Sequence, residues 1–180
     1  MATGKTVDPV ANLLAACVTG YSAVSASTAS TKAAETLQAV LNSSRVDVEP
    51  QMLPAVQRLE EHRGLVDPAF SAARHLFRWN PTPRSDDGGK LLALAAVSEM
   101  FDTSHTVGLM VVSADAEYPL HQHQPHECYL VISGVGRWRF GDNPRHCRIR
   151  PGSTLYNRPY DCHGVIADSQ PIVAMYVLWD

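Results

Sequence analysis

Hydrophobic positions between residues 8 and about 79 recur at intervals of three and four, the spacing of an amphipathic helix. In DPVANLLAACVTGYSAV, which begins at Asp8, Pro9 stands where a first helical turn accepts it. Three more helical stretches are expected: STASTKAAETLQAVLNSS (27–44), EPQMLPAVQRLEEHRG (49–64, with Gly64 as C-cap) and DPAFSAARHLFRW (67–79). We expect these helices to cover one face of a sheet or to form a dimer contact.

After the turn-rich stretch NPTPRSDDGG (80–89), the pattern changes to short segments rich in β-branched and aromatic residues. About eight strands are predicted: KLLALAAVSEMF (90–101), HTVGLMVVSA (105–114), CYLVIS (128–133), VGRWRF (135–140), HCRIR (146–150), STLYN (153–157), HGVIA (163–167) and IVAMYVLW (172–179). Several are apolar on both faces, which favours a small β-barrel partly covered by the helices. The prediction is one mainly β domain, with a helical segment (1–80) packed on a barrel (90–180).

The composition excludes several classes of function. A length of 180 residues suits one domain, and a net charge of −3 without a basic stripe argues against a nucleic-acid partner. No apolar run reaches the roughly 20 residues of a membrane span. The four cysteines lack CxxC spacing and are expected to be reduced and buried, which favours a cytoplasmic location. Asp8 and Pro9 before the first apolar stretch favour a packed helix there over a signal peptide.

Metal-binding side chains gather in YPLHQHQPHECYLVISG (118–134). In an extended strand His121 and His123 point to one side, as do Glu127 and Tyr129, while His126 breaks this inward parity. His163, after a proline-containing turn, offers a fourth ligand. Imidazoles with one carboxylate suit a divalent transition metal such as Zn, Fe, Mn, Ni or Cu(II), and the ligand set does not choose among them.

The spacing His-x-His, three residues, Glu, six residues, Gly resembles the first sequence motif of the cupin superfamily, here His121, His123, Glu127 and Gly134. Gly152, Pro159 and His163 supply the skeleton of the looser second motif. Three departures lie outside the ligands: Asp115 replaces the leading Gly, the usual Pro-x-Gly is absent, and Ala167 stands where Asn is frequent. The resemblance covers about residues 92–179 and implies a cupin β-barrel of the jelly-roll type.

Two tyrosines narrow the resemblance. The pattern YPxHxHxxxExY, followed later by a single His, is similar to the cupin-type dimethylsulfoniopropionate lyases and their lyase-like relatives, including a branch with an N-terminal helical segment of this length. The resemblance implies metal ligands at His123, Glu127 and His163, with His121 as a further ligand or close neighbour. It also implies active-site tyrosines at Tyr118 and Tyr129, with Tyr129 in the usual place of the base and Tyr118 as substrate-binding partner or alternative base.

The implied reaction is a β-elimination. Removing the proton next to the carboxylate of dimethylsulfoniopropionate expels dimethyl sulfide and leaves acrylate. A nearby cation favours the phenolate form of a tyrosine, which makes it a stronger base. Aromatic faces attract a cationic leaving group, and four aromatic residues are candidates for such a wall: Trp138, Tyr156, Tyr160 and Trp179.

Other functions fit the same ligands. A cupin dioxygenase could use the three histidines and Glu127, although oxygen chemistry does not require the tyrosine pair. A different metal-dependent lyase or isomerase acting on another small acid is also compatible. A binding or sensing cupin without turnover is a third possibility, but no helix-turn-helix or second domain is evident to transmit a signal. In each case the partner is a small molecule, and a homodimer is possible.

Overall fold

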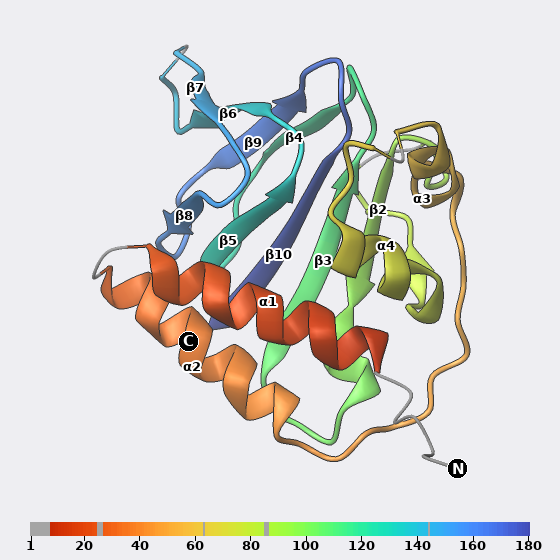
Figure 1. Ribbon diagram of the computed structural model, residues 1–180. Coiled ribbons are helices and arrows are strands. Elements are labelled where there is room, and N and C mark those ends of the chain that lie inside the picture. The colour runs from red at the N-terminus through yellow and green to blue at the C-terminus, as the bar shows by residue number, and fades with distance from the viewer. Residues whose placement is uncertain (1–7, 25–26, 63, 85–86, 144) are drawn as a thin grey trace.

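The protein consists of two facing antiparallel sheets with helices packed outside the larger one (Figure 1). The computed structural model describes the chain except for residues 1–7, 25–26, 63, 85–86 and 144. The larger sheet has the order β1-β2-β3-β10-β5-β8, and the smaller sheet has the order β4-β9-β6-β7. The mainly β prediction is therefore confirmed.

The strands are β1 (Trp79–Asn80), β2 (Leu92–Ala96), β3 (Thr106–Val112), β4 (Glu117–His121), β5 (His126–Ser133), β6 (Gly136–Phe140), β7 (Cys147–Ile149), β8 (Thr154–Asn157), β9 (His163–Ala167) and β10 (Ile172–Trp179). All eight predicted segments contain a strand. Strand β1 was not predicted, and β4 was not among the eight predicted segments. VSEM was predicted as strand, whereas Val97–Met100 forms a 3₁₀ turn, η3, which carries the chain from β2 toward β3.

The first two helices begin close to where the sequence predicts them. Helix α1 (Pro9–Ala23) is capped by Asp8, whose carboxylate accepts a bond from the Val10 amide, and α2 (Thr28–Leu41) is capped by Ser27. The remaining helices are short: α3 (Pro54–Gln57), η1 (Arg58–His62), α4 (Pro68–Ala73) and η2 (Arg74–Leu76).

The third predicted helix is much shorter than expected. Residues 49–53 are not helical, because Gln51 forms a β-bridge with Arg78 that holds this stretch extended. The last turns are 3₁₀ and end at His62, so Gly64 lies beyond the helix rather than at its cap. The fourth predicted helix, α4, also gives way to a 3₁₀ turn before Trp79 enters β1.

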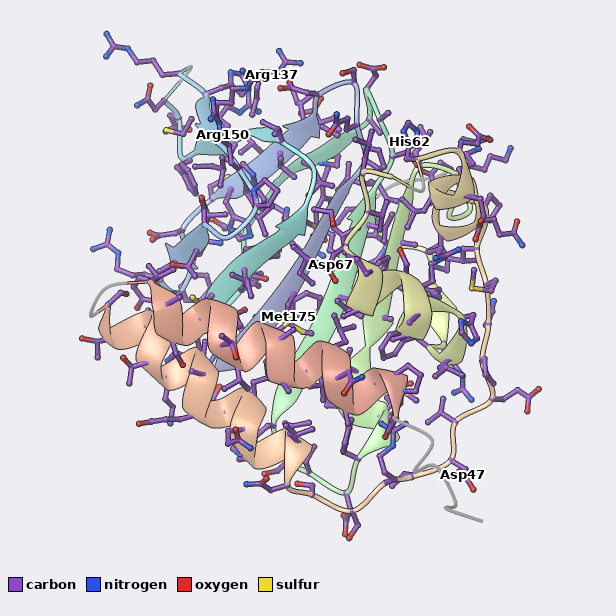
Figure 2. The ribbon with its side chains drawn as sticks, viewed as in Figure 1. Asp47, His62, Asp67, Arg137, Arg150 and Met175 are labelled. Carbon is purple, nitrogen blue, oxygen red and sulfur yellow. The ribbon has the colours of Figure 1, made fainter. Side chains whose placement is uncertain are left out.

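Alternation along the strands builds two separate cores. On β5, Cys128 and Leu130 pack toward the helices, whereas Tyr129 and Val131 pack between the sheets. The buried hydroxyl of Tyr21 on α1 donates to the carbonyl of Cys128 at 2.8 Å and contacts that of Met175 at 3.2 Å. Figure 2 places Met175 beside α1. These contacts join the helical layer directly to the central strands, whose other face forms the site.

Two turn positions of the predicted motif, one that departs from it and one that matches it, have left-handed backbone conformations. Asp115 adopts a left-handed φ of 59°, a conformation that Asp tolerates better than most residues, so it takes the place of a glycine. At Gly134 φ is 79°, and a Cβ would lie 2.1 Å from the carbonyl oxygen of Pro171. Only glycine fits there, between β5 and β6.

The cysteine prediction is correct for two residues and wrong for another. Cys17 and Cys128 are free and buried, and burial raises the pKa of each thiol to about 12. Cys147 is also free but is exposed, because it lies on the short strand β7 at the edge of the smaller sheet. None of the described helices combines the length and apolar character that crossing a membrane requires.

Candidate active site

A cavity of about 270 Å³ lies between the sheets, where β4 and β5 meet the end of β10. Its polar lining comes from the predicted motif and from the segment that precedes β2. The residues that line it are Arg84, Leu94, Tyr118, His121, His123, Pro125, Glu127, Tyr129, Tyr176 and Leu178. His163 adjoins this wall, because it is paired with His121 across β4 and β9.

Three histidines converge on this cavity, and each is oriented in the same way. In every case Nδ1 lies at hydrogen-bond distance from a nearby backbone carbonyl, an arrangement in which a proton on Nδ1 leaves the Nε2 lone pair for a metal ion. The Nδ1–oxygen distances are 2.9 Å for His121 to Pro119, 3.0 Å for His123 to Pro125 and 2.8 Å for His163 to Asp161.

The histidine nitrogens fit a metal ion better than any protein partner. One ring nitrogen from each of His121, His123 and His163 lies within 4.8 Å of the others. Nε2 of His163 is fully buried and has no hydrogen-bond partner among the residues that the structure describes, although it lies 3.0 Å from a Glu127 oxygen. Buried polar atoms are rarely left without a partner. Imidazole nitrogens that converge in this way are the ordinary donors for a divalent transition metal.

Glu127 is the buried carboxylate of the site, with 4% of its surface exposed. One of its oxygens lies 3.2 Å from Nε2 of His123 and accepts a 3.0 Å bond from the side-chain amide of Asn157. Asn157 was missed in the sequence, since STLYN reads only as a strand. Because Glu127↔Asn157 is a cross-strand pair on β5 and β8, the amide is directed at the carboxylate.

The charges of the site follow from these contacts. Burial alone would raise the pKa of Glu127, but its contacts with His123 and His163 outweigh burial and lower that pKa to about 2. Burial lowers the pKa of His121 to about 4, so at neutral pH this ring is uncharged and able to ligate. The Glu127 contact raises the pKa of His123. The cavity therefore holds a carboxylate beside imidazoles.

Both predicted tyrosines lie at the histidines. The Tyr118 ring is 4.5 Å from that of His121, and the Tyr129 ring is 6.2 Å from that of His163. Burial, reinforced by the Glu127 carboxylate, raises the pKa of Tyr129 well above its usual value. The ring centroid of a third tyrosine, Tyr176, lies 6.2 Å from that of Tyr129. Tyr176 was not predicted, because IVAMYVLW is apolar at nearly every position and its pattern does not show which side chains point inward.

The four aromatic residues predicted to surround the leaving group lie in three different environments. Trp138 is buried between the sheets and packs on Tyr129, with ring centroids 5.2 Å apart. Tyr156 and Trp179 lie on the helix-facing side of the larger sheet, where both rings stack with His126. Tyr160 is 61% exposed. None of the four lines the cavity, whose apolar wall comes instead from Leu94, Tyr176 and Leu178.

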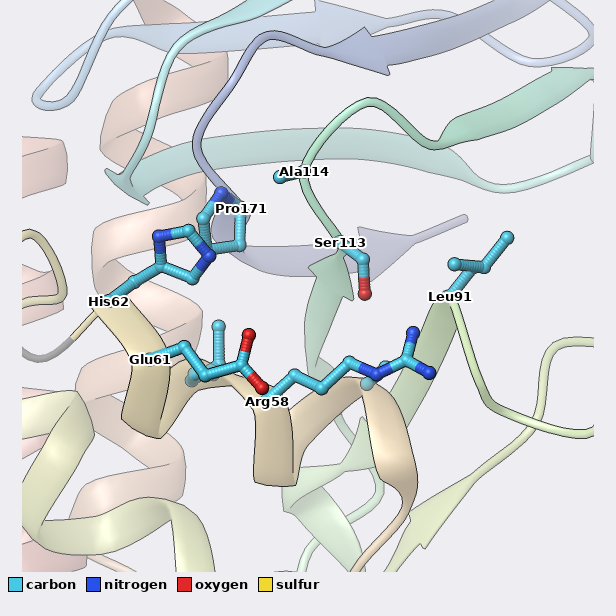
Figure 3. A pocket seen from close by; sticks show the side chains of 9 residues that line it. Arg58, Glu61, His62, Leu91, Ser113, Ala114 and Pro171 are labelled. Carbon is cyan, nitrogen blue, oxygen red and sulfur yellow. The ribbon is translucent and has the colours of Figure 1, made fainter.

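A second cavity lies at the opposite ends of the strands. It measures about 280 Å³ and is shown in Figure 3, with Ser113 and Pro171 on one side and Arg58 and His62 on the other. The hydroxyl of Ser113 is buried there without a hydrogen-bond partner. The two cavities share no lining residue.

Two facing antiparallel sheets with a histidine cluster between them are the arrangement expected of a cupin fold. Solved structures of dimethylsulfoniopropionate lyases share this fold. A chain from the crystal structures of the dimethylsulfoniopropionate lyases RdDddP and RnDddQII superposes with a TM-score of 0.75 at 17% identity, covering 96% of this chain and 92% of that one. The lyase DddQ from Ruegeria pomeroyi DSS-3 gives a TM-score of 0.73 at 19% identity, covering 97% and 93%.

A more distant likeness covers a smaller part of the chain. The polyketide cyclase RemF from Streptomyces resistomycificus gives a TM-score of 0.50 at 16% identity, covering 57% of this chain and 72% of that one. At these identities the structural likenesses establish the fold and not the activity.

In sequence, residues 96–174 match the family model for dimethylsulfoniopropionate lyase. The matched segment contains all three histidines, Glu127, Tyr118 and Tyr129. No curated protein is significantly similar to the chain. The resemblance to the dimethylsulfoniopropionate lyases is therefore confirmed for the barrel half of the protein.

Proposed function

We propose that this protein is a metal-dependent lyase that converts dimethylsulfoniopropionate to dimethyl sulfide and acrylate. The observation that carries the proposal is the position of Tyr129: it belongs to the segment matched to the lyase family and lies in one cavity with the histidine cluster. A cupin dioxygenase would use similar metal ligands, but oxygen activation does not require a pair of tyrosines beside the metal.

The proposed metal ligands are the imidazoles of His121, His123 and His163, with the Glu127 carboxylate beside them. A bound divalent cation would supply positive charge that favours the Tyr129 phenolate and stabilises negative charge developing on the substrate carboxylate. The backbone carbonyls keep the rings oriented before any ion arrives.

Tyr129 is proposed as the base. Its oxygen accepts the proton from the carbon next to the substrate carboxylate. The electron pair of that C–H bond then forms the double bond of acrylate, and the bond from the β carbon to sulfur breaks, so that dimethyl sulfide leaves with both electrons. Packing of Trp138 against Tyr129 keeps the phenol in place. Tyr118, at the His121 side, is proposed to bind the substrate or to act as an alternative base.

The apolar part of the cavity suits the sulfonium end of the substrate. Leu94, Tyr176 and Leu178 line this part of the cavity. An aromatic face attracts a cation, and methyl groups pack well on leucine side chains. Tyr176 is therefore proposed for the role that was predicted for four other aromatic residues, none of which lines the cavity.

The test is gas chromatography of the headspace above metal-reconstituted protein and dimethylsulfoniopropionate. Wild-type protein is expected to release dimethyl sulfide, and Tyr129→Phe to bind the same amount of metal while losing activity by about 100-fold or more, as the loss of a general base does. Tyr160→Phe, an exposed tyrosine, serves as the control. Full activity in Tyr129→Phe would remove this residue from the base role. Oxygen uptake without dimethyl sulfide would instead identify a dioxygenase.

A further inference from the structure

Arg84 brings a guanidinium group to the cavity from outside the barrel. It belongs to the turn-rich segment before β2, which reads in the sequence only as a linker and precedes the segment matched to the lyase family. Its Nη1 donates a hydrogen bond to the hydroxyl of Tyr118 at 3.2 Å, and the residue lines the cavity next to His121 and His123. Among the described lining residues it is the one Lys or Arg.

The guanidinium of Arg84 has more hydrogen-bond donors than its contact with Tyr118 uses. Arginine carries five N–H donors in a planar fork that matches a carboxylate. The contact with Tyr118 uses one nitrogen, and no ion pair joins Arg84 to a carboxylate among the residues that the structure describes. The buried carboxylate of the site, Glu127, is already engaged by His123 and Asn157. The remaining donors of Arg84 are therefore available to an anionic ligand.

We infer that Arg84 is a specificity residue that binds the carboxylate of small organic acids entering the histidine cavity. One carboxylate oxygen pairs with the guanidinium beside Tyr118, which leaves the rest of the molecule directed toward Tyr129 and the apolar wall. The ligand class is short, unbranched monocarboxylates of the size of acrylate or propionate. The inference rests on the proposed function only for the identity of the substrate, because carboxylate binding is measurable without turnover.

The experiment is isothermal titration calorimetry of metal-reconstituted protein with propionate and acrylate. Arg84→Met is expected to weaken binding of both acids by about 10- to 100-fold, the usual loss for a hydrogen bond to a charged group. Arg84→Lys keeps the charge without the fork and should give an intermediate loss. Arg150→Met is the matched control and should bind like wild type, because Arg150 is exposed, follows β7 and does not line the cavity (Figure 2).

Two further measurements separate a direct contact from a structural role. Propionamide has the shape of propionate without its charge, so its affinity should not depend on Arg84, and the metal content of Arg84→Met should equal that of wild type. In a Tyr118→Phe background, Arg84→Met should still weaken propionate binding. Loss of the Arg84 effect in that background would mean that the arginine only positions Tyr118, and would overturn the inference.

The outcomes also separate this inference from the proposed function. Release of dimethyl sulfide together with unchanged propionate affinity and unchanged KM in Arg84→Met would refute the role of Arg84 and leave the lyase proposal standing. Weakened propionate binding in Arg84→Met, with no dimethyl sulfide from wild type, would support the carboxylate site and refute the lyase proposal. Failure of wild-type protein to bind either acid would also refute the role of Arg84.

Discussion

At the scale of single residues, the site is organised by hydrogen bonds from the side chains of the ligand residues to the surrounding protein. A backbone carbonyl holds each Nδ1, so Nε2 is the ring nitrogen left to a ligand. Asn157 provides the same kind of support to Glu127 through a buried amide–carboxylate bond. Such supporting contacts restrict the orientation of ligands and strengthen metal binding.

Asn157→Ala should therefore weaken metal binding without removing a ligand. An affinity for zinc about 10- to 100-fold lower than that of wild type is expected, as for other supporting residues of metal sites. Competition with a chromophoric chelator measures this affinity. Asn143→Ala, at an exposed turn, should bind zinc as wild type does. Equal zinc affinity in Asn157→Ala and wild type would show that Glu127 needs no support, or is not a ligand.

The sequence predicted some of these residues and not others, for a physical reason. His121, His123, Glu127 and the two tyrosines lie close together in the chain, so their spacing is visible. Asn157 reaches the site through strand pairing, and Arg84 reaches it from a connecting segment. Their roles depend on which strands are neighbours in space. The aromatic wall was assigned by residue type alone, which does not say to which side of a sheet a ring points.

At the scale of elements, parity on a strand decides which side chains enter the cavity. On β10, Tyr176 and Leu178 face the cavity, while Trp179 packs toward the helices. Strand β4 was not among the predicted segments, because Pro119 and the polar or aromatic residues around it do not alternate regularly with apolar ones. A bulge also interrupts the pairing of β4 with β9. His123 lies beyond β4, so its direction is set by the following turn.

Gly108 on β3 makes room for Tyr176. A Cβ at this position would lie 2.2 Å from the phenol carbon and oxygen of Tyr176 and 2.7 Å from the carbonyl oxygen of Ala95. Gly108→Ala is therefore expected to lower the free energy of unfolding by about 1–3 kcal/mol, the usual cost of overpacking, and to displace the ring from the cavity wall. Urea unfolding measures the first effect.

The matched control for this prediction is Gly64→Ala, because nothing lies within 4 Å of a Cβ there. That substitution should change the free energy of unfolding only slightly. If Gly108→Ala were as stable as Gly64→Ala, then β3 and β10 would not be packed as closely around Tyr176 as the structure has them.

At the scale of the whole molecule, the helical layer is part of the shared fold, although no motif marks it. The sequence match to the lyase family covers residues 96–174, whereas the likeness to the two lyase structures covers 96% and 97% of the chain. The positions of α1 and α2 were predictable from periodicity. Their function was not, because α1 and α2 contribute packing to the central strands rather than side chains to the cavity. The division into two segments, the homodimer and the cytoplasmic location stay predictions.

We expect one divalent ion to be held by imidazoles that include the buried Nε2 of His163, which has no hydrogen-bond partner among the described residues. Metal content can be measured by plasma mass spectrometry of protein purified without added metal, and again after incubation with zinc and gel filtration. One equivalent of metal per chain is expected after zinc treatment of wild type and almost none in His163→Ala, with His146→Ala, a histidine outside the cluster, behaving like wild type. Full metal content in His163→Ala, or none in wild type, would contradict this expectation.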